Sequence, residues 1–297
     1  MCTLIALIGV VPDAPVVLAA NRDELYDRPA RAPVLLDIEP VRLSPSQAPF
    51  DRSASPDDGL VRSPRSSDPP RLRLGSGGVV GGLDLRSGGS WLAIARDGRF
   101  AGVTNQREAP QPPAPRSRGE WVRELVACPD RAAMRAYVDG LDATQYASGN
   151  LMFGDASGVD LAYVRRAGTI ERLALPAGIT VLTNDRLGSP DYPKAAHAAA
   201  RLAALDAAPW STMAEALPAI LGDHALPPVG QPPTLRPELP LPAELARALQ
   251  AVCIHTPRYG TRSATIAAIG EDGVRALRWA DGPPCTTPFV DAMTLFA

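Results

Sequence analysis

Cysteine is scarce in this chain of 297 residues, and its four cysteines lie far apart in sequence. Cys2, Cys128, Cys253 and Cys285 form no CxxC pair and no Cys/His cluster with the spacing of zinc ligands. The spacing therefore predicts neither a structural metal site nor a disulfide framework.

An excess of charge of one sign is also lacking. Lysine and arginine total 30 against 32 aspartates and glutamates, so the totals predict no basic surface for nucleic acid. The long apolar stretch at residues 3–20 is interrupted by Pro12, Asp13 and Pro15 and follows no basic residue, which argues against a membrane span or a signal peptide. We therefore expect a cytoplasmic protein with no membrane span and no nucleic-acid partner.

Apolar runs separated by turn residues predict a mixture of strands and helices. Strands are expected at 2–10 and 15–21 as a hairpin, at 78–85, 90–95 and 100–104 as a meander, and at 150–155, 160–166, 169–174, 178–183, 251–255, 263–269 and 274–279. Helices are expected at 117–127, 130–141, 193–206 and 212–221, with a short one after residue 242. Blocks of antiparallel strands alternating with helix pairs favour two packed sheets covered by helices, an α+β sandwich.

Residues 41–76 break this pattern. The segment is rich in Pro, Ser, Arg and Asp and has almost no apolar periodicity, which is typical of a flexible surface insertion. Since no other change in composition marks a boundary, we expect one domain over residues 1–297 that carries this insertion.

Cys2 is the most distinctive candidate for chemistry. Cysteine is small enough at position two for the initiator methionine to be removed, which would leave a thiol and an α-amine on one residue. The α-amine has an ordinary pKa of about 7.7–8.0 and can act as the base for its own thiol. From its position alone, a small buried side chain in a first strand is the more common role of such a cysteine.

Four polar residues, Asn21, Arg22, Asp23 and Glu24, follow the second expected strand. An arginine near a terminal thiol would lower the thiol pKa, and a carboxylate could hold and orient the ammonium group. The same residues also fit an ordinary charged turn at the surface.

Three further positions could face the same site. Arg262, which follows Tyr259-Gly260-Thr261, could supply a fixed cation, although a solvated turn is the alternative. Asn105 and Asn184 each end an apolar strand, where a side-chain amide could donate to a developing oxyanion. Asparagines at such places also close strands through Asx turns.

The ordered set of these motifs resembles the NRDE family, also called the transport and Golgi organisation family. The set comprises an initial Met-Cys-Thr, Asn-Arg-Asp-Glu, Gly88-Gly89-Ser90-Trp91, Thr104-Asn105, Leu182-Thr183-Asn184 and Tyr259-Gly260-Thr261-Arg262-Ser263. That family is similar in turn to the N-terminal-nucleophile hydrolases of the choloylglycine hydrolase and penicillin V acylase type. The resemblance implies a four-layer αββα fold and cleavage of non-peptide amides.

By this similarity, Cys2 would be the nucleophile, Asn184 and Asn105 would line the oxyanion hole, and Arg262 would support the thiolate. The early arginine and aspartate are spaced apart in those hydrolases but adjacent here, so either Asp23 or Glu24 could meet the amine.

The resemblance leaves two functions open. In the first, a cleft centred on Cys2 binds a small acyl or haem-like ligand and hydrolyses a linear amide. In the second, the same cleft is a non-catalytic carrier of haem or of acyl-CoA or another lipid in intracellular trafficking. Ligand contacts are expected from Asn21, Arg22, Asp23, Glu24, Tyr259 and Arg262, with no cofactor required and no metal. Bound haem would need an axial ligand, for which Cys2, a methionine, His197, His224 or His255 are the candidates.

Overall fold

Two antiparallel sheets packed face to face form the centre of the structure, which is a computed structural model that describes residues 2–36, 38, 78–108, 112–205, 207–226 and 242–297. The first sheet has the strand order β10-β1-β2-β11-β12-β13, made of Gly178–Leu182, Cys2–Val11, Ala14–Leu25, Tyr259–Gly270, Gly273–Ala280 and Val290–Asp291. The second has the order β3-β4-β5-β6-β7-β8-β9, made of Ala30–Leu35, Val79–Asp84, Leu92–Ala95, Phe100–Asn105, Gly149–Asp155, Gly158–Arg165 and Thr169–Ala174. Met1 and the expected insertion at 41–76 lie outside the described residues.

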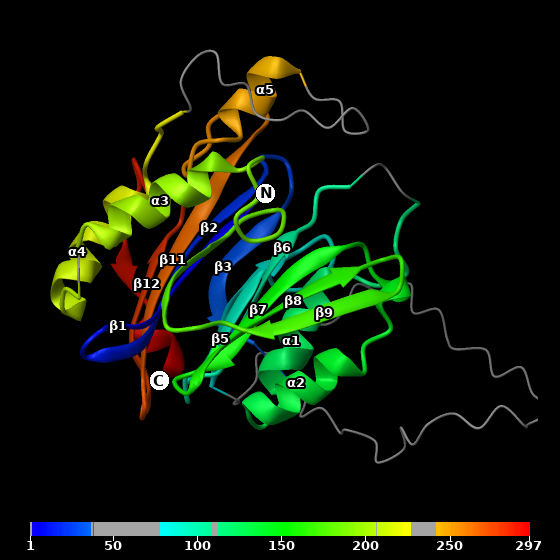
Figure 1. Cartoon of the computed structure of the whole chain (residues 1–297), viewed down its shortest axis with the longest axis horizontal. Coiled ribbons are helices and arrows are strands. Elements are labelled where there is room, and N and C mark those ends of the chain that lie inside the picture. The colour runs from blue at the N-terminus through cyan, green and yellow to red at the C-terminus, as the bar shows by residue number, and fades with distance from the viewer. Residues whose placement is uncertain (1, 37, 39–77, 109–111, 206, 227–241) are drawn as a thin grey trace, which may run out of the picture.

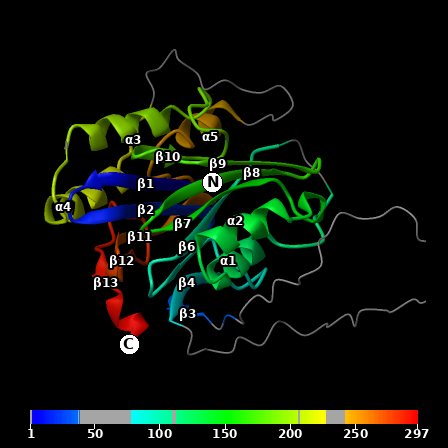
Figure 2. The ribbon, with the colours of Figure 1, turned by 60° about the horizontal axis from the view of Figure 1, so that its bottom comes forward.

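Helices cover the outer face of each sheet (Figures 1 and 2). The helices are α1 (Arg118–Ala127), α2 (Arg131–Asp139), α3 (Pro193–Ala203), α4 (Trp210–Leu221) and α5 (Ala243–Ala248), with short 3-10 turns at Ala143–Gln145 and Met293–Phe296. Helices α3 and α4 pack on the first sheet, and α1 and α2 pack on the second. This is the αββα sandwich expected from the sequence. Among the described helices, none is long and apolar enough to cross a membrane.

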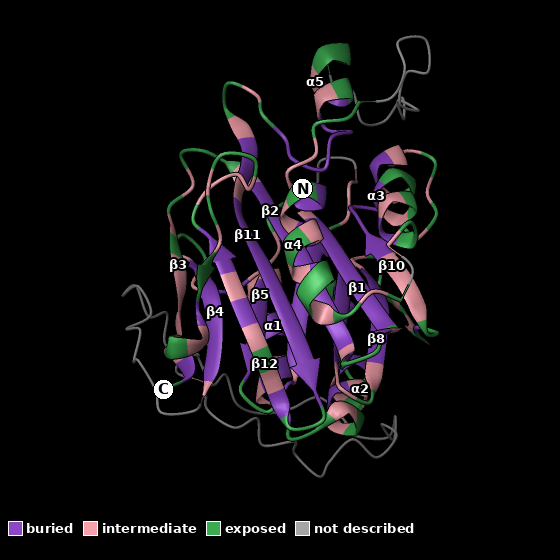
Figure 3. Cartoon of the chain, turned by 90° about the vertical axis from the view of Figure 1, so that its left-hand side faces the viewer, coloured by how far each residue is buried: buried purple, intermediate pink, exposed green. Residues whose placement is uncertain are grey.

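The alternation of side chains along each strand divides the core into layers, because successive residues of a strand point to opposite faces. In β1, Leu4, Ala6 and Ile8 pack between the two sheets. Ile5 and Leu7 point the other way and pack beneath α3 and α4. Figure 3 shows the result, with β1, β2 and β11 buried along most of their length.

The positions of the strands along the chain follow most of the expectations, with one strand wrong and two missed. Residues 251–255 form a loop with a single bridge from His255 to Gly260, because the Cys253 amide donates to the Asp223 carbonyl and the Ile254 amide donates to the Thr261 hydroxyl. A short buried apolar run does not distinguish such a loop from a strand. The edge strands β3 and β13 were not predicted.

Helix α1 approaches the turn before β5 at a pair of glycines. A Cβ atom added to Gly119 would lie 2.8 Å from the Cα of Gly89, and the Ser90 amide donates to the Gly119 carbonyl at 3.2 Å. No side chain fits in this contact, so these two glycines determine how closely α1 approaches the second sheet.

We expect Gly119→Ala to destabilise the protein. Alanine favours a helix over glycine by up to about 1 kcal/mol, but the added methyl group would push α1 away from Gly89, and such overpacking costs about 1–3 kcal/mol. Urea unfolding would measure the net loss. An unchanged or raised unfolding midpoint would contradict the close contact.

Candidate active site

Strand pairing places the Cys2 thiol and the Arg22 guanidinium on one face of the first sheet. Cys2 opens β1 and pairs directly with Arg22 of β2, and directly opposed residues share a face. Cys2 continues the set Leu4, Ala6 and Ile8 that faces the second sheet. The half-buried thiol therefore points into the space between the sheets.

A cavity of about 660 Å³ opens at this end of the two sheets. Residues from both sheets and from α1 line it, among them Cys2, Arg22, Asp23, Glu24, Trp91, Val103, Asn105 and Arg118. Its volume lies within the range of small-molecule sites. Five of the residues predicted at the site, Cys2, Arg22, Asp23, Glu24 and Asn105, therefore meet at one cavity.

Asn184 joins Cys2 to Asn105. Its Oδ1 atom accepts a hydrogen bond from the Cys2 backbone nitrogen at 3.2 Å, and its Nδ2 atom donates to the Asn105 carbonyl at 2.6 Å. An amide nitrogen carries two N–H groups, so the bond to Asn105 uses only one of them. Asn184 therefore orients the nitrogen of Cys2 and fixes the end of β6 beside it.

The segment that carries Asn184 is itself held to the second sheet. The Thr104 hydroxyl donates to the Thr183 carbonyl at 2.6 Å, and Nδ2 of the buried Asn150 donates to the Asp185 carbonyl at 3.2 Å. These bonds hold the backbone on both sides of Asn184. The partner of the Cys2 nitrogen is consequently fixed by residues of β6 and β7.

Arg22 is a buried cation held by an aromatic ring. Only 5% of its surface is exposed, its guanidinium lies 4.3 Å from the centre of the Trp91 ring, and Glu24 lies 4.0 Å away. Burial lowers the pKa of Arg22, while the charges of Cys2 and Glu24 raise it. Arginine stays protonated across the physiological range, so Arg22 gives the cavity a permanent positive charge beside the thiol.

Asp23 faces away from the thiol, toward α3. Its Oδ1 atom accepts a hydrogen bond from the Thr261 hydroxyl at 2.6 Å, and its Oδ2 atom lies 3.9 Å from the ammonium of Lys194, a fully buried side chain. Burial raises the pKa of Asp23 and lowers that of Lys194, and each group's charge opposes the shift of the other. The two groups form a buried ion pair behind Cys2.

The Cys2 thiol is protonated at neutral pH. Burial raises its pKa, and the Asp23 carboxylate raises it further, whereas a hydrogen bond from the Asp23 backbone and the charge of Arg22 lower it. The thiolate is the nucleophilic form of cysteine. A reaction at Cys2 therefore requires a base within contact of the sulfur.

Three residues predicted at the site have their contacts elsewhere. Arg262 donates to the carbonyls of Leu25 and Tyr26 at 3.0 and 2.8 Å and is not among the residues that line the cavity, whereas Arg22 is. A register shift between Thr261 and Ser263 moves Arg262 out of the paired positions of β11.

Asn21 and Tyr259 hold backbone rather than line the cavity. The Nδ2 atom of Asn21 donates to the carbonyls of Leu221 and Val252 at 2.8 and 2.9 Å. The Tyr259 hydroxyl donates to the Asp23 carbonyl at 2.8 Å. Both residues therefore position the motif that contains Arg22 and Asp23.

Three residues at or beside the site were not predicted from the sequence: Lys194, Trp91 as a partner of Arg22, and Arg118. Lys194 did carry a signal, because it shares a buried helical stripe with Ala198 and Leu202 at intervals of four residues. A lysine on an apolar stripe indicates a buried charge that needs a partner. Arg118 donates to the Ser148 carbonyl from the start of α1, and no local pattern indicates that it reaches the cavity.

We expect Arg22→Gln to slow alkylation of Cys2. Loss of the neighbouring cation raises the thiol pKa, which reduces the thiolate fraction at pH 8 and the rate by about threefold to tenfold. Arg22→Lys retains the charge and serves as the matched control. Peptide mass spectrometry after timed exposure to iodoacetamide gives the rate of alkylation at Cys2. Equal rates in all three proteins would show that Arg22 does not act on the thiol.

The buried pair predicts a strong coupling between Asp23 and Lys194. Either Asp23→Asn or Lys194→Met leaves one buried charge without its opposite, at a cost of about 3–5 kcal/mol. The double variant removes both charges, and its free energy of unfolding should lie nearer to wild type than that of either single variant. Urea unfolding of all four proteins tests this, and additive losses would exclude the coupling.

Solved structures with a similar backbone include two hydrolases. The Caenorhabditis elegans ortholog of N-acylethanolamine-hydrolyzing acid amidase has a TM-score of 0.48 and 11% sequence identity, over 90% of this chain and 92% of that one. The C2A mutant of the conjugated bile acid hydrolase from Clostridium perfringens has a TM-score of 0.47 and 10% identity, over 100% of this chain and 94% of that one.

Curated relatives share more of the sequence. The Transport and Golgi organization protein 2 homolog of Bos taurus is 26% identical over 276 residues, which cover 86% of this chain and 83% of the relative. The homolog from Homo sapiens is 24% identical over the same shares. A sequence model of Transport and Golgi organisation 2 matches residues 64–277, and the chain therefore belongs to the Transport and Golgi organisation 2 family.

Proposed function

We propose that the chain is a cysteine-dependent N-terminal-nucleophile amidohydrolase that acts on a small linear amide. The observation that carries this proposal is the contact of 3.2 Å between the Cys2 nitrogen and Asn184 Oδ1, made where the thiol enters the cavity beside Arg22. Removal of Met1 would convert this nitrogen from an amide into an α-amine. The base that the thiol requires would then belong to the same residue.

The reaction begins with transfer of the Sγ proton to the neutral α-amine, whose position is fixed by Asn184. The thiolate attacks the carbonyl carbon of the substrate, and the tetrahedral oxyanion accepts hydrogen bonds from the amide groups of Asn184 and Asn105. The ammonium then protonates the leaving nitrogen as the C–N bond breaks, which leaves a thioester on Cys2. Water then loses a proton to the α-amine and attacks the thioester. The C–S bond breaks, the acid is released, and the ammonium returns its proton to the Cys2 sulfur.

The cavity wall favours a substrate that is partly apolar and partly anionic. Trp91 and Val103 offer apolar surface, whereas Arg22 and Arg118 offer buried or half-buried cations. Arginine binds carboxylates and phosphates in a bidentate manner. An acyl amide that carries an acidic group on one side of the scissile bond matches this wall.

A second candidate function is non-catalytic binding of acyl-CoA. Four arginines that line the cavity favour it, because the phosphates of CoA require cations; they are Arg22, Arg28, Arg116 and Arg118.

Haem is a poorer match for the cavity than acyl-CoA. Among the described residues that line the cavity, Cys2 alone is of a type that commonly ligates haem iron, and no histidine or methionine joins it.

The proposed hydrolysis requires the α-amine as well as the thiol. Two forms of the protein that differ only in the free α-amine test this requirement. A chain with a short N-terminal extension keeps the thiol but replaces the amine by a peptide bond. A site-specific protease that leaves Cys2 as the first residue then restores the amine in the same preparation. We expect only the cleaved form to release acid from a panel of acyl amides and to accumulate a thioester visible by intact mass.

Cys2→Ala in the cleaved form should lose at least about a thousandfold in rate, as for removal of a covalent nucleophile. Equal turnover by the extended and cleaved proteins would contradict the proposed base. Absence of turnover and of acylation in the cleaved form, together with binding of acyl-CoA that Arg118→Gln weakens, would favour the carrier instead.

A further inference from the structure

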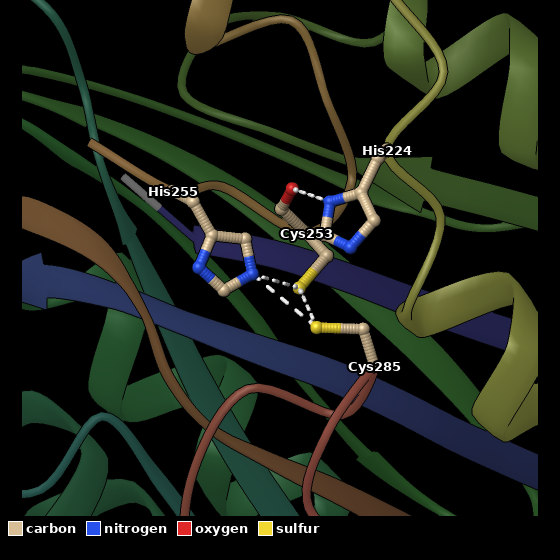
Figure 4. Close-up of side chains that lie close together, drawn as sticks. All are labelled: His224, Cys253, His255 and Cys285. Carbon is tan, nitrogen blue, oxygen red and sulfur yellow. Dashed lines mark hydrogen bonds between the residues drawn. The ribbon is translucent and has the colours of Figure 1, made fainter.

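Four side chains with metal-ligating atoms converge on the side of the first sheet near the end of α4 (Figure 4). They are His224, Cys253, His255 and Cys285, and one ligand atom from each lies within 4.8 Å of all the others. The spacing of the cysteines along the sequence led to the prediction of no metal site, but the fold brings these four residues together. Cys253 is buried, and the other three are exposed.

The distances among three of these atoms match the edges of a tetrahedron around zinc. The sulfurs of Cys253 and Cys285 are 3.7 Å apart, and His255 Nε2 lies 3.7 Å from the first and 3.3 Å from the second. With Zn–S and Zn–N bonds of about 2.3 and 2.0 Å, ideal S···S and S···N edges are about 3.8 and 3.5 Å. An ion could therefore bond to all three with little rearrangement.

His224 supplies the fourth corner, in the tautomer that a metal needs. Its Nδ1 atom lies 3.0 Å from the Cys253 carbonyl, and a carbonyl can only accept, so Nδ1 carries the proton. The lone pair is then on Nε2. A hydrogen bond from the second ring nitrogen to a carbonyl is the usual way in which a metal-binding histidine is oriented.

We propose that His224, Cys253, His255 and Cys285 bind one zinc ion in a closed tetrahedral site with a structural role. Two thiolates and two imidazoles are a ligand set that zinc prefers, and four protein ligands leave no position for water or substrate. The site is distinct from the cavity at Cys2, because none of its four residues lines that cavity.

The proposed ion would link three loops of the chain. His224 follows α4, Cys253 and His255 precede β11, and Cys285 lies between β12 and β13. The same loops hold the Asn21–Glu24 motif from behind, since Asn21 donates to the carbonyls of Leu221 and Val252. Zinc would therefore stabilise the segments on which this motif rests.

The test measures metal in the whole chain, purified under reducing conditions from medium with added zinc. We expect about one zinc ion per chain by elemental mass spectrometry, and a Cys253→Ser/Cys285→Ser variant should lose at least about 90% of it. Removal of the ion with a chelator should lower the melting temperature, and added Zn²⁺ should restore it. Reconstitution with Co²⁺ should give the thiolate charge-transfer and visible bands of a tetrahedral site.

Two matched variants control for the residue types. Cys2→Ala removes an accessible thiol, and His197→Gln removes the remaining histidine, so both should keep the full zinc content. His255→Ala should lose zinc even if the cysteine variant folds poorly.

Zinc content that is below about 0.1 per chain, or that is equal in all variants, would overturn the proposal. So would a Cys253–Cys285 disulfide in the protein as purified under reducing conditions, because it would remove both sulfur ligands.

Discussion

The pairing of β1 with β2 is the constraint on which the rest of the site depends. Because side chains alternate along a strand, the match of Cys2 with Arg22 decides that the thiol and the guanidinium share the face toward the second sheet. A slip of one residue would send the thiol into the layer beneath α3 and α4. The apolar residues behind Cys2 prevent this slip, since Leu4, Ala6 and Ile8 would leave the central core with it.

The same alternation along β2 sends the side chains of Arg22 and Asp23 to opposite faces of the first sheet. Arg22 points between the sheets and lies against Trp91, whereas Asp23 points outward and pairs with Lys194 of α3. Adjacent residues thus serve opposite layers of one sandwich. Burial is the largest cause of the raised pKa of the thiol, the Asp23 carboxylate adds to it, and the Arg22 guanidinium opposes it. The α-amine is then the base that the proposed reaction needs.

The fold and part of the site could be predicted because they depend on local pattern. The hairpin, the meander and the helix pairs all carry periodicities that a single sequence reveals, and Cys2, Arg22, Asp23 and Asn105 stand at the ends of such strands. The remaining side chains at the site come from other layers of the fold: Lys194, Trp91 and Arg118. A local sequence pattern does not indicate which layer packs against which. Arg262 has the expected residue type, but a register shift in β11 turns it toward the Leu25 and Tyr26 carbonyls. The cluster of His224, Cys253, His255 and Cys285 was not predicted either, because its members come from three loops that only the fold brings together.

Asn184 follows β10, the strand that borders β1, yet its neighbours Thr183 and Asp185 are hydrogen-bonded to Thr104 and Asn150 of the opposite sheet. The nitrogen of Cys2 is thus carried by one sheet and aligned by the other. Asn184 therefore couples the placement of the Cys2 nitrogen to the packing of the two sheets against each other, and the base in the proposed reaction would be positioned by both sheets at once.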